Sequence, residues 1–453
     1  MDSRKEFSVK VIKEYVLPLS FVFVITVLLC IVSLVVTALI PKEAIAENCK
    51  KSGEYFYERD LFPYLIREQF NTRQDNYADT ILVNIMYHID ETKVIPSLVE
   101  ASYYQKEGEN VHHSFYRALQ EEKIPNIEYF RYWHGAMVLL RPLFLFTDIS
   151  GVRGILGILL LILTFAVSVS LHRKKETALG VCYLLSNLLL QSWICFFCIE
   201  YITTFLIMNI AALGVIDCYH KYQQSRQVLN QKIAGLMCVC GITACFFDFL
   251  TTETLTVTIP LFLLLVFLYR NHQLKDIRKE VCFLAIQGGI WGISYGFMFL
   301  LKWGIAAVFL GKEAFGKAME SAAVRMVGTV TLGNTNLDET ATSWQRFLGA
   351  LARNQGALFP FQGEMKLGAA VAAFWGLCFL FFGIIYLFRS KNISYKMIGL
   401  SLLLCLVPYL RYIVLANHAY LHYFFTYRAQ LIVLLAGLFC CWEFGLKNIR
   451  KLR

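Results

Sequence analysis

The feature that most constrains this chain is a series of apolar runs, each about as long as a lipid bilayer is thick. A helix of roughly 20 residues crosses the ~30 Å hydrocarbon core of a membrane. Such runs lie near residues 16–40, 152–171, 178–196, 198–217, 232–247, 254–269, 281–301, 367–388, 397–416 and 427–446. We therefore predict an all-α polytopic membrane protein, folded as a single membrane-embedded domain over residues 1–453, with about ten transmembrane helices.

The composition agrees with a chain that needs lipid as its solvent. Hydrophobic residues make up 57% of the sequence and charged residues 17%, which lies outside the usual range of soluble globular domains. The first run is much longer than the roughly 7 to 15 apolar residues of a signal peptide, so we expect an uncleaved first span.

Basic residues gather in every second connection between the runs. These tracts lie at residues 172–175, 221–232, 270–279, 389–396 and 447–451, and Arg4, Lys5, Lys10 and Lys13 precede the first run. The positive-inside rule places them in the cytoplasm, with both termini. The net charge of +10 is spread over these short tracts, so we predict no nucleic-acid partner.

The connections of the other set face outward, and two of them are large. They cover residues 41–151 and 310–366. Helix-period apolar patterns occur over Leu61–Phe70 and Ile81–Met86 in the first, and over Phe315–Met326 in the second. We expect helices there, lying in the membrane interface in the first loop.

Cysteine usage points to packing. Most of the 14 cysteines lie inside apolar runs, and Cys49 is the clear exception in a large loop, so we expect no disulfide there. Cys195 and Cys198 form a C-x-x-C without a second pair, and we predict no metal site from it.

Polar residues gather at the outer ends of the spans, where a shared site could form. They are Glu200, Asp248, Glu253, Lys302, Arg411, His418, His422 and Arg428. Ionisable residues are nearly absent from the middle of the spans, which argues against ion-coupled transport.

In the first outer loop, Asp75 and Asp79 are the candidate catalytic residues. Carboxylates at i and i+4 can share one helical face, and one of them could act as general base on a hydroxyl group. The alternative is a helix cap, with Asn76 as N-cap and Asp79 at the third helical position.

Two further groups are candidates for substrate binding. Arg131 and His134, together with Asp248, could bind a substrate, or the first two could be interface anchors. In the last outward connection Arg411, His418, His422 and Arg428 could bind the phosphate of a lipid-linked donor. The alternative there is an aromatic belt with a snorkelling arginine.

The architecture resembles the GT-C superfamily of membrane glycosyltransferases. The resemblance rests on one span, a large outer loop with Asp75 and Asp79, many further spans, and the runs Asp248–Thr252 and His422–Arg428. It implies a GT-C-like fold in a bacterial plasma membrane and a polyprenyl-phosphate-linked sugar as donor. GT-C enzymes typically place the catalytic acid soon after the first span, so the base stays open among Asp75, Asp79, Glu43 and Glu47.

The resulting hypothesis is an inverting glycosyltransferase at the extracytoplasmic face. It would move a sugar from a polyprenyl-phosphate donor to a cell-envelope glycan or other acceptor. A divalent cation stays open as a cofactor. The rivals are a polysaccharide polymerase or ligase, favoured if Arg325 and Arg346 are essential, and a lipid or glycan transporter, which would need a continuous polar path across the bundle.

Overall fold

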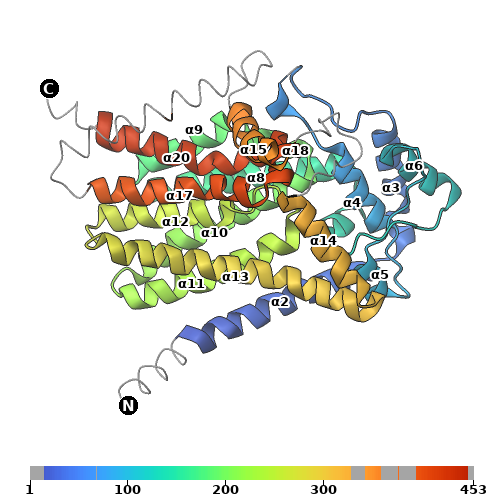
Figure 1. Cartoon of the computed structure of the whole chain (residues 1–453), viewed down its shortest axis with the longest axis horizontal. Coiled ribbons are helices and arrows are strands. Elements are labelled where there is room, and N and C mark those ends of the chain that lie inside the picture. Colours follow the sequence, from blue (N-terminus) through green and yellow to red (C-terminus); the bar gives the residue numbers. More distant parts are fainter. Residues whose placement is uncertain (1–14, 68, 328–341, 359–375, 377–393, 447–453) are drawn as a thin grey trace.

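The computed structural model describes residues 15–67, 69–327, 342–358, 376 and 394–446. Within these residues every regular element is a helix, and backbone pairing is limited to two isolated β-bridges. The long helices lie side by side in one bundle, and the segment between the first two of them forms a separate layer across one end (Figure 1). We call this the loop end.

Seven described helices are long and apolar enough to cross a membrane, which agrees with an all-α multi-pass membrane protein. They are α2 (Leu17–Ala38), α8 (Ile149–Arg173), α10 (Ile199–Tyr222), α11 (Arg226–Phe247), α13 (Ile277–Leu310), α17 (Ser394–Val414) and a final stretch, Tyr423–Phe444, that includes α19 (Tyr423–Thr426), η4 (Tyr427–Gln430) and α20 (Leu431–Cys440).

Two of the predicted spans form shorter helices. The run near 178–196 gives α9 (Thr177–Leu189) followed by η3 (Ser192–Phe197), and the run near 254–269 gives α12 (Leu255–Arg270). Apart from residue 376, the run at 367–388 lies outside the described residues. The count of ten spans therefore stays a prediction.

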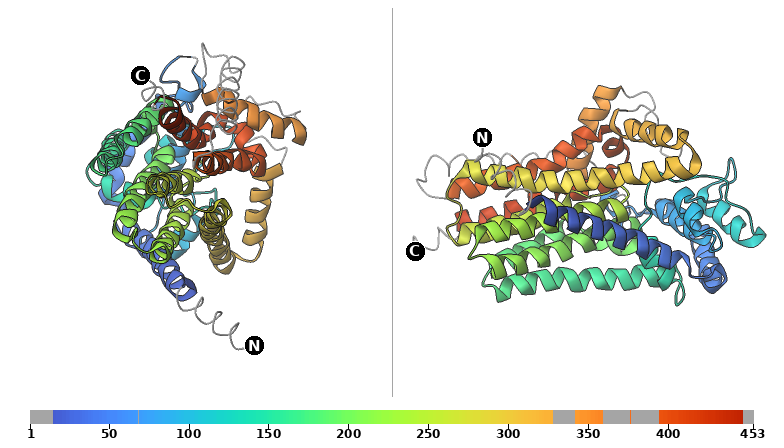
Figure 2. Two further views of the ribbon diagram at one scale, coloured as in Figure 1. Left: turned by 90° about the vertical axis from the view of Figure 1, so that its left-hand side faces the viewer. Right: turned by 90° about the horizontal axis from the view of Figure 1, so that it is seen from below.

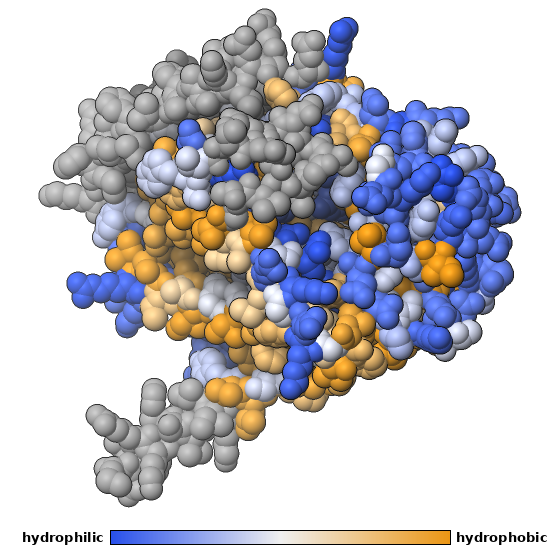
Figure 3. Space-filling model, turned by 45° about the vertical axis from the view of Figure 1, so that its right-hand side comes forward, coloured by the Kyte–Doolittle hydropathy of each residue, from blue (hydrophilic) through white to orange (hydrophobic). Residues whose placement is uncertain are grey.

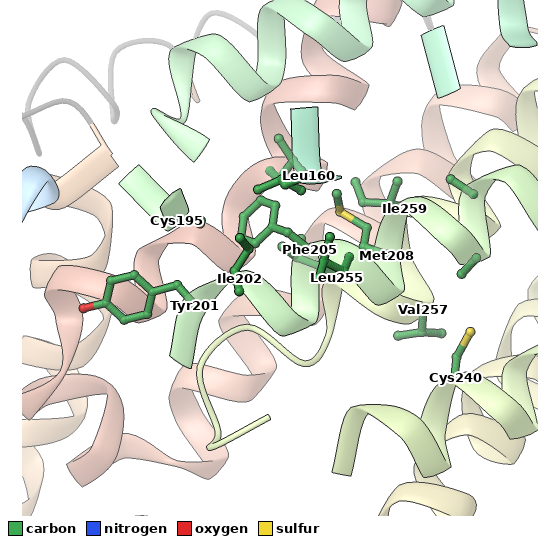
Figure 4. Packing of buried hydrophobic residues seen from close by; sticks show 14 of the residues in the cluster. Leu160, Cys195, Tyr201, Ile202, Phe205, Met208, Cys240, Leu255, Val257 and Ile259 are labelled. Atoms are coloured by element: carbon green, nitrogen blue, oxygen red, sulfur yellow. The ribbon is translucent and has the colours of Figure 1, made fainter. Parts of the chain in front are cut away.

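Helix α12 forms the core of the bundle. Leu255 to Leu268 are all buried, which is the pattern of a helix surrounded by others. It packs against α10, and close packing of buried side chains from α8, α10, α11 and α12 fills the space between them (Figure 4). Helix α2 lies at the edge of the bundle, where most of its side chains are exposed or half-buried (Figure 2).

The loop end consists of α3 (Lys42–Tyr57), α4 (Asn76–Tyr87), α5 (Val94–Glu100), α6 (Val111–Glu121) and α7 (Met137–Leu143). Hydrophilic residues cover much of this end, whereas hydrophobic residues cover much of the spans (Figure 3). Buried Arg141 of α7 connects two other segments of the layer. Its guanidinium donates hydrogen bonds to the carbonyl oxygen of Ile40, just after α2, and to that of Met86 in α4. The large first loop of the sequence prediction is thus a folded layer.

The predicted loop helices are partly correct. Helix α4 contains Ile81–Met86, and α14 (Glu313–Val327) contains Phe315–Met326. The expected helix over Leu61–Phe70 is wrong: within its described residues the chain forms an irregular segment with a β-bridge between Tyr64 and Arg73. Pro63 accounts for this, because proline lacks the backbone N–H and disfavours helix at the preceding residue.

Candidate functional site

A cavity of about 340 Å³ lies at the loop end, between the folded layer and the ends of the spans. That volume is at the lower end of the ~300–1,000 Å³ typical of small-molecule sites. Its charged or imidazole-bearing side chains are Asp75, Glu200, Arg131, Arg325, His134, His418 and His422, and its aromatic wall is formed by Phe62, Tyr77, Tyr103, Tyr129, Tyr132, Phe249 and Phe425.

Asp75 lies at the start of α4 and faces this cavity. Its Oδ1 accepts a hydrogen bond of 2.8 Å from the backbone N–H of Ala78, so Asp75 is the N-cap of the helix. This corrects the predicted cap at Asn76. Asp75 is 4% exposed, and burial raises its pKa to about 7 against the opposing effect of the Ala78 N–H. A carboxyl group that titrates near neutral pH suits proton transfer.

Asp79 lies one turn further along α4 and points elsewhere. It is fully buried, and Arg153 of α8 donates to its Oδ2 from Nε at 2.9 Å and from Nη2 at 2.6 Å. The backbone N–H of Ile199, at the start of α10, donates to the same carboxylate at 3.0 Å. Asp79 therefore does not line the cavity, and the predicted shared face with Asp75 is not formed. Its carboxylate joins α4, α8 and α10.

The other two candidates for the base lie on the outer side of α3. Glu43 is exposed, and Glu47 is 82% exposed in an ion pair with Lys51. Neither contributes to the cavity. Among the four residues that the sequence left open, Asp75 is the one that lines the cavity.

Arginine side chains from two separate loops supply the positive charge of the cavity. Arg325, in the last turn of α14, donates to the Ser321 carbonyl at 2.8 Å and lies over the ring of Tyr132. The guanidinium of Arg131 lies 4.4 Å from the centre of the Tyr129 ring. The Nε atoms of both arginines are buried and have no hydrogen-bond partner in the described part of the chain. Buried donors of this kind are normally satisfied, so they are available to a ligand.

The three histidines of the cavity are neutral hydrogen-bonding groups. Burial lowers the pKa of His134 and of His422 to about 3, and it also lowers that of His418. Each of His134 and His422 keeps a buried Nδ1 without a partner among the described residues. Any charge on a bound anion must therefore be balanced by the arginines, with the imidazoles contributing hydrogen bonds.

Local backbone geometry positions two of these histidines. His418 Nε2 lies 2.9 Å from the carbonyl oxygen of Leu250, a residue that adopts a positive φ of 65° between α11 and α12. Next to His134, the backbone of Gly135 donates to the Phe246 carbonyl at 2.9 Å, and a Cβ on Gly135 would lie 2.4 Å from that oxygen. Glycine is needed for this approach.

Three of the predicted binding residues are buried outside the cavity lining. Arg411 donates from Nε to Glu253 at 2.7 Å and also to the Leu250 carbonyl. Arg428 donates to the Asn71 carbonyl and lies over the Tyr201 ring. Asp248 accepts hydrogen bonds from Thr204 and Thr251. Arg411 and Arg428, which the sequence assigned to a phosphate site, therefore lie outside the cavity lining, and their described hydrogen bonds are made within the protein.

The residues present do not make a complete metal site. In the part of the chain that the structure describes, no group of three or more His, Cys, Asp and Glu side chains is arranged to hold a metal ion. Protein sites for hard cations usually offer several oxygen ligands.

Comparison with protein-family models, with curated proteins and with solved structures finds no match to this chain.

Sequence reasoning found part of the cavity. It identified Asp75, Arg131, His134, His418 and His422, all of which line it. Glu200 was noted at the end of a span without a role, and Arg325 was noted for a rival function. Their joint position depends on contacts between distant segments, such as α14 with α18 (Ala416–Leu421). Clustering of polar residues at one end of the spans was the signal that could have found them.

Proposed function

We propose that this protein is a GT-C-type glycosyltransferase that moves a sugar from a polyprenyl-phosphate donor to an acceptor hydroxyl. The observation that carries the proposal is one cavity with a carboxyl group titrating near neutral pH and two arginines with unpaired donors. A lipid donor keeps its phosphate near the membrane surface, where the ends of the spans lie. The acceptor would be a cell-envelope glycan or another hydroxyl compound on the extracytoplasmic side of a bacterial plasma membrane.

In this reaction Asp75 takes the proton from the acceptor hydroxyl. The acceptor oxygen forms a bond to the anomeric carbon from the face opposite the phosphate, so the configuration inverts. The bond between that carbon and the phosphate oxygen breaks, and its electron pair leaves with the polyprenyl phosphate. General-base assistance of this kind contributes roughly 100-fold or more to the rate.

The arginines balance the charge that develops on the leaving phosphate. Guanidinium groups suit phosphate oxygens because they present several N–H donors in a planar fork. Arg325 and Arg131 supply them here, and the neutral imidazoles of His418 and His422 add hydrogen-bonding groups. The aromatic wall offers flat surfaces for the apolar faces of a sugar ring.

The proposal is tested with purified protein and a panel of polyprenyl-phosphate sugars. We expect release of polyprenyl phosphate with at least one of these donors, faster when an acceptor is present. No release from any member of the panel, with or without added divalent cation and acceptor, would contradict the proposal.

A polymerase or ligase is the second candidate, because Arg325 comes from the second large loop and lines the same cavity. Arg346 of the same loop is buried and donates to Asn417 at 2.6 Å. To separate the two candidates, a donor linked through a diphosphate belongs in the panel beside the monophosphate donors. Release of polyprenyl diphosphate in place of the monophosphate would favour this candidate.

A further inference from the structure

Glu200 is an acidic residue of the cavity whose sequence context indicates no particular role. It is the second residue of α10, a position where the helix dipole favours negative charge. Its side chain is 7% exposed, and Oε2 receives no hydrogen bond from any N–H or hydroxyl group of the described residues. Glu200 therefore presents an unsatisfied buried oxygen at the cavity.

Asp75 and Glu200 line the same cavity, and the electrostatics of the two buried groups include a side-chain hydrogen bond between their carboxyl groups. Carboxylates are acceptors only, so a hydrogen bond between two of them requires a proton on one. Two adjacent buried carboxylates that share a proton carry one negative charge in place of two, which avoids their mutual repulsion.

Within the described residues, no arginine or lysine side chain donates a hydrogen bond to either carboxyl group of this pair. Arg153 donates to Asp79, Asn76 and Tyr55, and Arg411 is paired with Glu253. The remaining titratable or charged groups that act on Asp75 or Glu200 are mostly acidic or neutral. They are Asp79, Asp248, Arg73, Tyr77, Cys198 and Tyr201. Arg73 is the one cation of this set, and it stacks on the rings of Phe62 and Phe424.

We propose that Asp75 and Glu200 hold one proton between them, with protonated Glu200 as the positioning residue that donates a hydrogen bond to Asp75 and keeps Asp75 ionised as the base. This rests on the proposed glycosyl transfer. In the resting pair the proton lies on Glu200 and Asp75 is ionised. The acceptor proton then moves to Asp75 as the new glycosidic bond forms, and it is released to water after the product leaves.

The shared proton can be observed without activity, by infrared spectroscopy of the carboxylic acid carbonyl band. At pH 7 the wild-type protein should show a band from a protonated buried acid that is absent in Glu200→Gln and present in the control Glu109→Gln, which alters an ion pair remote from the cavity lining. In Asp75→Asn the band should shift, because the partner of Glu200 changes from a carboxylate to an amide. A band that is unchanged in both Glu200→Gln and Asp75→Asn would overturn the proposal.

The pH profile of kcat/KM gives the second test. The active pair carries one negative charge, so activity should fall at low pH, when a second proton binds, and at high pH, when the dianion repels the donor phosphate. Glu200→Gln keeps a donor to Asp75 at every pH and should abolish the alkaline fall while leaving the acid limb. An unchanged alkaline limb in Glu200→Gln would contradict the proposal. If the wild-type protein releases no polyprenyl phosphate, the proposed function fails, and the infrared bands still decide the pairing.

Discussion

Arg153 donates two hydrogen bonds to a single oxygen of Asp79, from Nε at 2.9 Å and from Nη2 at 2.6 Å. Both side chains are almost completely buried, with 5% and 0% of their area exposed. Asp75, four residues earlier, has no hydrogen bond from an arginine or lysine within the described residues and faces the cavity. The two aspartates, one turn apart, thus have opposite environments. The charge of Asp79 is neutralised by an arginine, whereas the carboxyl group of Asp75 is available to a ligand in the cavity.

This contrast predicts that Asp79 contributes to stability. Removing one member of a buried ion pair leaves an uncompensated charge and costs about 3–5 kcal/mol. Asp79→Ala should therefore lower the free energy of unfolding by that amount, measured by denaturation in detergent. The double variant Asp79→Leu with Arg153→Leu should recover part of the loss. An Asp79→Ala protein of unchanged stability that had lost turnover would assign the catalytic role to Asp79 instead.

The ion pair between Arg411 and Glu253 predicts that Arg411, a candidate phosphate-binding residue in the sequence analysis, contributes to stability. Arg411→Ala should destabilise the protein, because Glu253 would remain buried without its partner. Replacing both residues by methionine should restore stability relative to the single variant. Donor affinity per folded molecule should change little. A large loss of affinity in a stable double variant would return Arg411 to the binding site.

Replacing Arg325 should have the opposite effect to replacing Arg411: donor affinity should fall more than stability. Its Nε has no partner among the described residues, so its loss removes ligand contacts more than internal ones. We expect Arg325→Ala to weaken donor binding by about 30-fold, which corresponds to ~2 kcal/mol, and Arg325→Lys to give an intermediate loss because the planar fork is missing. Arg117→Ala, which removes two ion pairs, one with Glu109 and one with Glu121, is the control. Equal donor affinity in all of these proteins, measured by equilibrium binding, would exclude Arg325 from the phosphate site.

The sequence predicts a structural feature well when that feature depends on residues that are neighbours in the chain. Apolar runs of membrane length predicted the seven described helices that are long enough to span a membrane, and the periodicity of Ile81–Met86 and Phe315–Met326 predicted α4 and α14. The helix expected over Leu61–Phe70 did not form, because Pro63 lacks a backbone N–H and this outweighs the helical spacing of the apolar residues around it.

The partners of charged residues could not be predicted in this way. Arg411 looked available for a phosphate, yet its carboxylate partner Glu253 is 158 residues away in sequence. Asp75 and Asp79 look equivalent in sequence, and the difference between them is decided by Arg153 on another helix. One-dimensional patterns locate such groups at one end of the bundle, and the packing of helices decides which of them remain unpaired.

Burial of Asp75 also predicts a pH-dependent stability. Its pKa is raised from the ordinary value of 3.8 to about 7, so the folded state binds more protons than the unfolded state between these values. The stabilising contribution of the protonated group is present below pH 4 and is lost as the pH rises to about 7. Asparagine caps a helix as well as aspartate does and stays uncharged. Asp75→Asn should therefore gain more in melting temperature over wild type at about pH 8 than at about pH 4. An equal difference at both pH values would argue against a raised pKa.

The central claim is that Asp75 removes the acceptor proton during transfer of a sugar from a polyprenyl-phosphate donor. The most direct measurement is the rate of polyprenyl phosphate release at saturating donor and acceptor, compared among wild type, Asp75→Asn and Asp90→Asn. Asp90 is an exposed acid that hydrogen-bonds Thr92 and serves as the control. We predict a loss of roughly 100-fold or more for Asp75→Asn, with donor affinity and folding retained and with Asp90→Asn indistinguishable from wild type. A folded Asp75→Asn protein that turns over at the wild-type rate would contradict the account.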